Sequence, residues 1–84
     1  MSKYQPLYNF LAKTKRIPMT MSFQQIELLL GFSLPVTARK RNQWWANEIN
    51  QNTTHVQCRA WRNAGFVVRN LDLAAQSLDF VPVA

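Results

Sequence analysis

The spacing of apolar residues predicts an amphipathic helix near the start of the chain. Leu7, Phe10 and Leu11 follow i, i+3, i+4 spacing, which brings them to one side of a helix. We therefore expect a helix from Pro6 to Lys13 with these three side chains in the core. The run from Met19 to Ser22 alternates as in a strand but is brief, so a strand there is an optional element.

A second helix is expected directly afterwards, because both of its ends carry recognisable signals. Ser22 followed by Gln25 matches a capping box, in which each side chain bonds the backbone N–H of the other residue. Gly31 suits the left-handed position that commonly follows a helix. We expect Glu27 to face solvent or to pair with a nearby cation. The apolar stripe of this helix consists of Phe23, Ile26, Leu29 and Leu30.

The next stretch carries three consecutive cations and two adjacent tryptophans. Ala38–Asn47 contains no Gly, no Pro and no acid, so we expect it to form one continuous helix. Neighbouring helical residues point about 100° apart, so the two indoles cannot share the middle of one buried stripe. The expected inward set is Leu34, Ala38, Trp45 and Ile49, and the outward set is Lys40, Gln43, Trp44 and Asn47. Two interpretations stay open. Either Trp44 lies at the edge of a phosphate-binding face, or both indoles belong to the core.

A further helix is expected from His55 to Ala64, capped by Thr53 or Thr54 and closed by Gly65. Its buried face would hold Val56, Ala60, Trp61 and Ala64, and its opposite face would hold His55, Arg59 and Arg62. Two arginines about one turn apart can meet successive phosphates or the edge of a base. This helix is therefore the predicted groove-entering element of a nucleic-acid binder.

The end of the chain predicts a β-hairpin. Phe66 to Leu71 and Ser77 to Val83 are rich in β-branched and aromatic residues, and Asp72 to Gln76 supplies the turn. The whole chain, residues 1–84, is expected to form a single domain. The predicted fold class is α+β and similar to a winged helix-turn-helix. It has about four helices, the C-terminal hairpin and the optional third strand.

The charge balance points to a polyanionic partner. Ten Lys and Arg stand against four Asp and Glu, which gives a formal net charge of +6 and a pI near 10.3. The same balance would suit an acidic protein partner. We expect no membrane association, because the apolar runs are too short to span a bilayer. Cys58 is the only cysteine and the first residues lack a signal-peptide core, so the expected location is cytoplasmic.

Catalytic and metal-binding patterns are missing from the sequence. His55 and Cys58 are three residues apart, but two ligands do not make a structural zinc site, which needs four. Gly31 and Gly65 are the only glycines, so the chain has no glycine-rich phosphate loop. We therefore expect no enzyme activity, no cofactor and no metal.

Several short motifs resemble those of a known family. They are Tyr4-x-Pro6-Leu7, Phe23-x-x-Ile26-Glu27-x-x-Leu30-Gly31-x-x-Leu34-Pro35, Ala38-Arg39, Trp44-Trp45-x-Asn47 and Gln57-x-x-Ala60-Trp61-x-x-Ala64-Gly65-Phe66. This pattern resembles a small bacterial and phage domain family of unknown function. The resemblance implies work on nucleic acid, since some members look related to restriction or defence. It supplies no catalytic residues.

The leading hypothesis is a non-enzymatic nucleic-acid-binding module, with DNA preferred to RNA, in a phage, defence or regulatory setting. The predicted contact residues are Arg39, Lys40, Gln43, Trp44, Asn47, His55, Arg59 and Arg62, and Asn42 and Gln57 would add amides that can read bases. The alternative is a small protein-interaction module, such as a phage-encoded inhibitor or a toxin–antitoxin subunit. A homodimer is left open under either hypothesis.

Overall fold

The computed structural model describes residues 3–47 and 56–83, with the exception of the Val56 side chain. Four α-helices, one 3₁₀ helix and three strands are formed by these residues. In chain order they are α1 (Gln5–Ala12), β1 (Met19–Ser22), α2 (Phe23–Leu30), α3 (Val36–Lys40), η1 (Asn42–Trp45), α4 (Val56–Asn63), β2 (Phe66–Asp72) and β3 (Ser77–Pro82). The α+β class is therefore correct. None of these helices has the length and apolar character needed to cross a bilayer.

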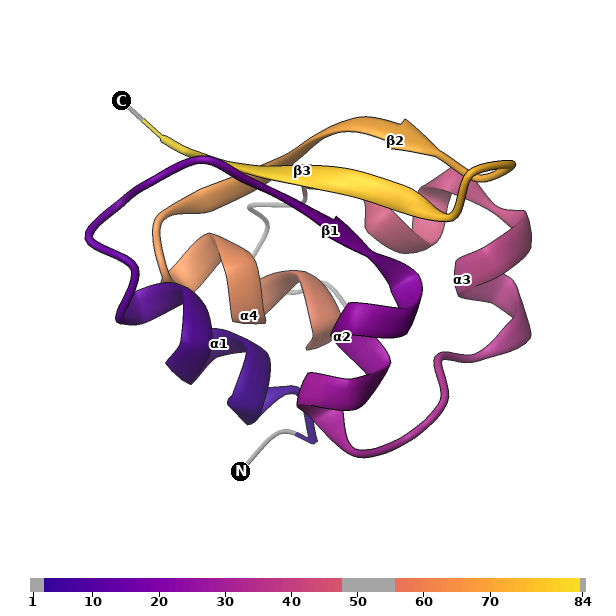
Figure 1. The fold of residues 1–84 in the computed structure, drawn as a ribbon, viewed down its shortest axis with the longest axis horizontal. Helices are drawn as coiled ribbons and strands as arrows, with labels where there is room; N and C mark the ends of the chain where they lie inside the picture. Colours follow the sequence, from indigo (N-terminus) through magenta and orange to yellow (C-terminus); the bar gives the residue numbers. More distant parts are fainter. Residues whose placement is uncertain (1–2, 48–55, 84) are drawn as a thin grey trace.

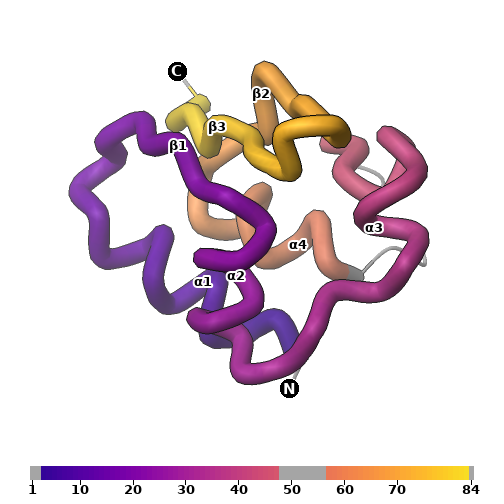
Figure 2. Tube along the Cα trace, turned by 45° about the vertical axis from the view of Figure 1, so that its right-hand side comes forward, coloured from indigo at the N-terminus to yellow at the C-terminus, as the bar shows by residue number. Residues whose placement is uncertain are grey.

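The three strands form one antiparallel sheet in the order β1-β3-β2. Phe80 in the central strand lies opposite Met19 on one side and Val68 on the other. Figure 1 shows α1, α2 and α4 on one side of the sheet, with α3 beyond the hairpin turn. The rotated view in Figure 2 keeps α3 and the α1–β1 connection at opposite ends of the molecule. Both the predicted hairpin and the optional strand over Met19 to Ser22 are confirmed.

The helix-end signals of α2 act as the sequence indicates. The Gln25 backbone N–H donates to the Ser22 hydroxyl at 3.0 Å, and the Ser22 N–H donates to the Gln25 side-chain oxygen at 2.9 Å. Gly31 ends the helix with φ of +85°, which a residue without Cβ adopts at little cost. These contacts fix where α2 starts and stops, and so fix the path of the chain toward α3.

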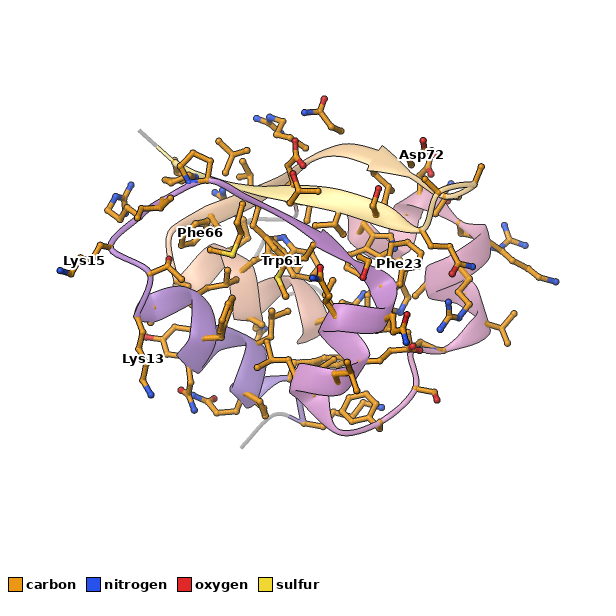
Figure 3. All side chains as sticks on the ribbon, viewed as in Figure 1. Lys13, Lys15, Phe23, Trp61, Phe66 and Asp72 are labelled. Carbon is orange, nitrogen blue, oxygen red and sulfur yellow. The ribbon has the colours of Figure 1, made fainter. Side chains whose placement is uncertain are left out.

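The core is a stack of aromatic rings between the sheet and the helices. Trp45 lies between Phe23 and Trp61, with ring centroids 5.0 Å and 5.8 Å away. Trp61 in turn contacts Phe80 of the central strand at 5.9 Å. Figure 3 labels Phe23, Trp61 and Phe66 in the interior under the sheet. Because these rings are large and almost fully buried, they supply much of the apolar area that a chain this short can bury.

The predicted continuous helix over Ala38–Asn47 is wrong. Helix α3 ends at Lys40, Arg41 is extended with φ of −131° and ψ of 127°, and the 3₁₀ turn η1 follows. The Trp45 indole N–H donates to the Ala38 carbonyl at 2.8 Å, which is the acceptor that the next helical N–H would need. The break also lets adjacent indoles point in different directions. Trp45 enters the core, and Trp44 lies half-buried against Tyr4.

Candidate nucleic-acid interface

The residues at the break between α3 and η1 form an exposed run of polar side chains. Lys40, Arg41, Asn42 and Gln43 are all exposed, and we call these four residues the basic segment. Within residues 3–47 and 56–83, none of their side chains makes a hydrogen bond or an ion pair. Two cations and two amides are therefore presented together to solvent.

The basic segment is held at both ends by buried groups. Ala38 and Trp45 are buried on either side of it and are joined by the indole–carbonyl hydrogen bond. The Gln57 side-chain amide of α4 donates to the Trp44 carbonyl at 2.9 Å. Because the ends are fixed, the four exposed side chains project from an ordered turn, which limits the entropy lost on binding.

Arg39 is not the unpaired cation that the sequence suggests. Its guanidinium forms an ion pair with Glu27 of α2 and donates to the Gln76 side chain in the hairpin turn at 3.1 Å. Glu27 also accepts from the Leu34 backbone N–H at 2.7 Å. The Leu34 N–H and Arg39 together hold the pKa of the Glu27 carboxyl below its usual value. Arg39 therefore joins α2, α3 and the hairpin, and both of its terminal nitrogens already donate to partners inside the fold.

Asn47 is engaged inside the fold, which corrects its predicted role as a base-reading amide. Its side-chain NH₂ donates to the Val68 carbonyl at 2.9 Å, and its oxygen accepts from the Val68 N–H at 2.8 Å and from the Trp61 indole at 3.0 Å. Val68 lies in an edge strand of the sheet, so the amide takes the place of a neighbouring strand. Gln57 is likewise buried and bonded to Trp44, so neither amide is free to read a base.

Helix α4 follows the two faces that the sequence predicts only in part. Ala60 and Trp61 are buried and Arg59 is exposed, as predicted, but Arg62 and Ala64 are both half-buried. The Arg62 Nε is buried and has no hydrogen-bond partner in the described part of the chain. His55 lies outside the described residues. The Gln57–Trp44 hydrogen bond and the Trp45–Trp61 stack place the start of α4 against η1.

The structure thus brings together part of the predicted set and adds to it. Lys40, Gln43 and the half-buried Trp44 lie on or next to the basic segment. Asn42, predicted as an additional base-reading amide, belongs to the same exposed surface. Arg41 also belongs to it but was not among the predicted contact residues. The signal for Arg41 was present, since it continues the run of cations without a break. Within the described residues, no three His, Cys, Asp or Glu side chains are grouped to hold a metal ion.

The chain belongs to the family described as a domain of unknown function, DUF7662, whose family model matches residues 4–81. The match covers every helix and strand except Pro82, the last residue of β3. No curated protein and no solved structure matches the chain. The family therefore defines the extent of the domain, and the function has to be argued from the side chains.

Proposed function

We propose that this domain is a non-enzymatic nucleic-acid-binding module of the cytoplasm, with DNA preferred to RNA, in a phage, defence or regulatory setting. The observation that carries the proposal is the basic segment, an ordered and exposed run of two cations and two amides. Lysine and arginine that neutralise phosphates release condensed counterions, which supplies most of the affinity of such binders. The Asn42 and Gln43 amides can add hydrogen bonds to base edges or sugars.

A winged-helix arrangement is consistent with the order of elements. A strand between the first two helices pairs with the last strand of the hairpin, so the sheet order is β1-β3-β2. In this arrangement α4 would be the groove-facing helix, with Arg59 as its exposed cation. The hairpin would be the wing. Its turn from Leu73 to Gln76 has no charged residue, so the adjacent basic segment would supply the phosphate contacts there.

The test is a binding titration with variants that change charge equally at two places. Lys40→Gln/Arg41→Gln removes two cations from the basic segment, and Lys13→Gln/Lys15→Gln removes two from the other end of the molecule. Binding of a fluorescein-labelled oligonucleotide is followed by anisotropy from about 50 to 200 mM salt. We expect the first variant to weaken binding at least about 10-fold at low salt. It should flatten the log–log salt slope by about 1.5 to 2.

The matched control decides whether charge or position matters. The Lys13→Gln/Lys15→Gln variant should keep a salt slope close to that of the unaltered protein. Equal losses of affinity in both variants would show that binding depends on net charge alone, and the proposed site would be wrong. Absence of binding to any oligonucleotide at low salt would remove the proposed function itself.

A protein partner is the second candidate, and two exposed aliphatic side chains favour it. Leu28 is 76% exposed and Val36 is 64% exposed, and both lie in sequence between Glu27 and Arg39, which form an ion pair. Exposed apolar side chains can add buried area to a protein interface, in which arginine is enriched. Recovery of one stoichiometric acidic protein, lost with Leu28→Ser and without bound nucleic acid, would favour this candidate. A homodimer remains part of either proposal.

A further inference from the structure

Three aromatic rings meet beside the basic segment. Tyr4 contacts Phe32 edge-on with ring centroids 5.8 Å apart, and it contacts Trp44 edge-on at 6.0 Å. The Lys3 ammonium lies 5.4 Å from the Phe32 centroid and 5.5 Å from the Tyr4 centroid. Tyr4 is buried and packs against both Phe32 and Trp44, which we call the two outer rings.

The two outer rings differ from the rest of the aromatic core in their exposure. Phe32 and Trp44 are half-buried, whereas Trp45 and Trp61 are 2% and 0% exposed. Each of the two residues therefore keeps part of its surface open to solvent. Trp44 follows Gln43 directly and both belong to η1, so the aromatic group starts one residue after the basic segment.

We propose that Phe32 and Trp44 form a stacking platform for unpaired bases, with phosphates held by Lys3 and the basic segment. The ligand class is single-stranded nucleic acid, so this inference rests on the proposed nucleic-acid binding but replaces groove entry by α4 with stacking on unpaired bases. Binders of single strands combine cations along the backbone path with aromatic rings under the bases. A duplex would present phosphates and base edges to this surface but no base faces, because those are already stacked on one another.

An external ammonium group is the other ligand that an aromatic group can hold. Here the Lys3 ammonium lies over the Phe32 and Tyr4 rings, and a base that stacks on Phe32 would displace it toward the phosphate. The chain carries a formal net charge of +6, which repels a second cation. Glu27 is the carboxylate closest in sequence to Phe32. It already accepts from the Leu34 N–H and forms an ion pair with Arg39. The electrostatics therefore favour a neutral base with its phosphate over a cation.

The experiment compares an oligothymidine strand with a duplex of equal length, using fluorescence anisotropy and intrinsic tryptophan fluorescence. Phe32→Leu and Trp44→Leu remove one ring each, and Trp44→Phe restores an aromatic ring at the second position. Phe10→Leu is the matched control, because Phe10 is an exposed aromatic (39%) on α1 away from the basic segment. Far-ultraviolet circular dichroism and a urea midpoint confirm that each variant is folded under the assay conditions.

We expect tighter binding of the single strand than of the duplex, with quenching of the Trp44 emission. Phe32→Leu and Trp44→Leu should each weaken single-strand binding about 5- to 10-fold. Trp44→Phe should recover most of that loss, and Phe10→Leu should bind as the unaltered protein does. Should Trp44→Leu fail to fold, Phe32→Leu and Lys3→Gln still test the platform, since both alter side chains at its surface.

The outcomes separate this inference from the proposed function. If Lys40→Gln/Arg41→Gln weakens binding but Phe32→Leu matches Phe10→Leu, the basic segment stands and the platform is wrong. Equal or tighter binding of the duplex would also overturn the platform. If the protein binds a trimethyl-lysine peptide and Phe32→Leu abolishes that binding, the ligand of the aromatic group is a cation and the single-strand proposal is wrong.

Discussion

Two cationic regions of similar sequence lie at opposite ends of this molecule. One is the connection between α1 and β1, Lys13–Arg16, and the other is the basic segment after α3. Lys13 and Lys15 are labelled at one edge of Figure 3, and α3 lies at the other edge in Figures 1 and 2. The connection has three cations in four residues and the basic segment has two. Charge density alone would favour the connection as the binding site.

The surroundings of the two regions instead favour the basic segment as the binding site. The α1–β1 connection starts at the C-terminal end of α1, where a helix favours cations without any ligand. Arg16 is used internally, because it donates to the Val83 carbonyl and lies against Gly65. The basic segment instead lies beside half-buried aromatic rings and offers two amides. A cationic run indicates a binding site when its neighbours include groups that can recognise a ligand.

The largest expected effect is a loss of stability when the buried Asn47 amide, which follows η1, is removed. Asn47→Ala removes three hydrogen bonds and leaves the Val68 N–H, the Val68 carbonyl and the Trp61 indole without their partner. At about 1 kcal/mol for each bond, the free energy of unfolding should fall by about 3 kcal/mol. Urea denaturation at neutral pH measures this loss.

Two controls show whether the loss belongs to the buried amide. Asn42→Ala removes an exposed amide of the same size and should change the free energy of unfolding by less than about 0.5 kcal/mol. Arg16→Ala, which removes the anchor of the α1–β1 connection, should cost about 1 kcal/mol. A cost for Asn47→Ala no larger than that of Arg16→Ala would contradict the difference in anchoring.

The sequence predicted the local features well because they depend on residues three or four positions apart. The Ser22–Gln25 capping box, the Gly31 helix end and the burial of Ala60 and Trp61 on α4 are of this kind. The position of Arg59 on α4 follows from helical spacing alone. Such short-range features can be predicted without knowing which elements pack together.

The site residues were harder to predict because their state depends on distant partners. The helix break at Arg41 follows from the Trp45–Ala38 hydrogen bond, and Arg39 is engaged through Glu27, twelve positions earlier. Asn47 meets Val68 across 21 positions. An amide in a cation-rich run looks the same in sequence whether it faces solvent or the edge of a strand.

An intermediate effect is expected where the α1–β1 connection meets the rest of the fold. Gly65 has φ of +88°, and a Cβ placed there would lie 2.8 Å from the Arg16 Nη1 atom. Gly65→Ala should therefore lower the free energy of unfolding by about 1 to 2 kcal/mol, mostly through the left-handed backbone. Thermal and urea unfolding measure the change.

The Arg16→Ala background separates the backbone cost from the contact with the guanidinium. With the Arg16 side chain removed, Gly65→Ala should cost about 1 kcal/mol, which is the backbone part alone. An equal cost of Gly65→Ala with and without the Arg16 side chain would show that Arg16 does not rest on this glycine. The Val83 carbonyl would then be the contact that anchors Arg16.

The smallest effect concerns pH, and it arises at the end of α3 that precedes the basic segment. The pKa of Glu27 is lowered by the Leu34 N–H and by Arg39, so the folded state favours the ionised carboxylate. This stabilisation is complete above the ordinary carboxyl pKa of about 4.5. It is lost as the pH falls through the lowered value. Below about pH 5 the unaltered protein should therefore lose stability faster than Glu27→Gln.

The difference between these two proteins is the quantity to measure, because Asp79 also has a lowered pKa, from its hydrogen bonds to Asn70 and Thr20. That carboxylate contributes equally to both curves and cancels. Urea midpoints from pH 7 to pH 3 should converge toward acid, with a gap at neutral pH below about 1 kcal/mol. A gap that stays constant across this range would show that the Glu27 charge contributes nothing. Arg39 would then be as available to a polyanion as Lys40 and Arg41.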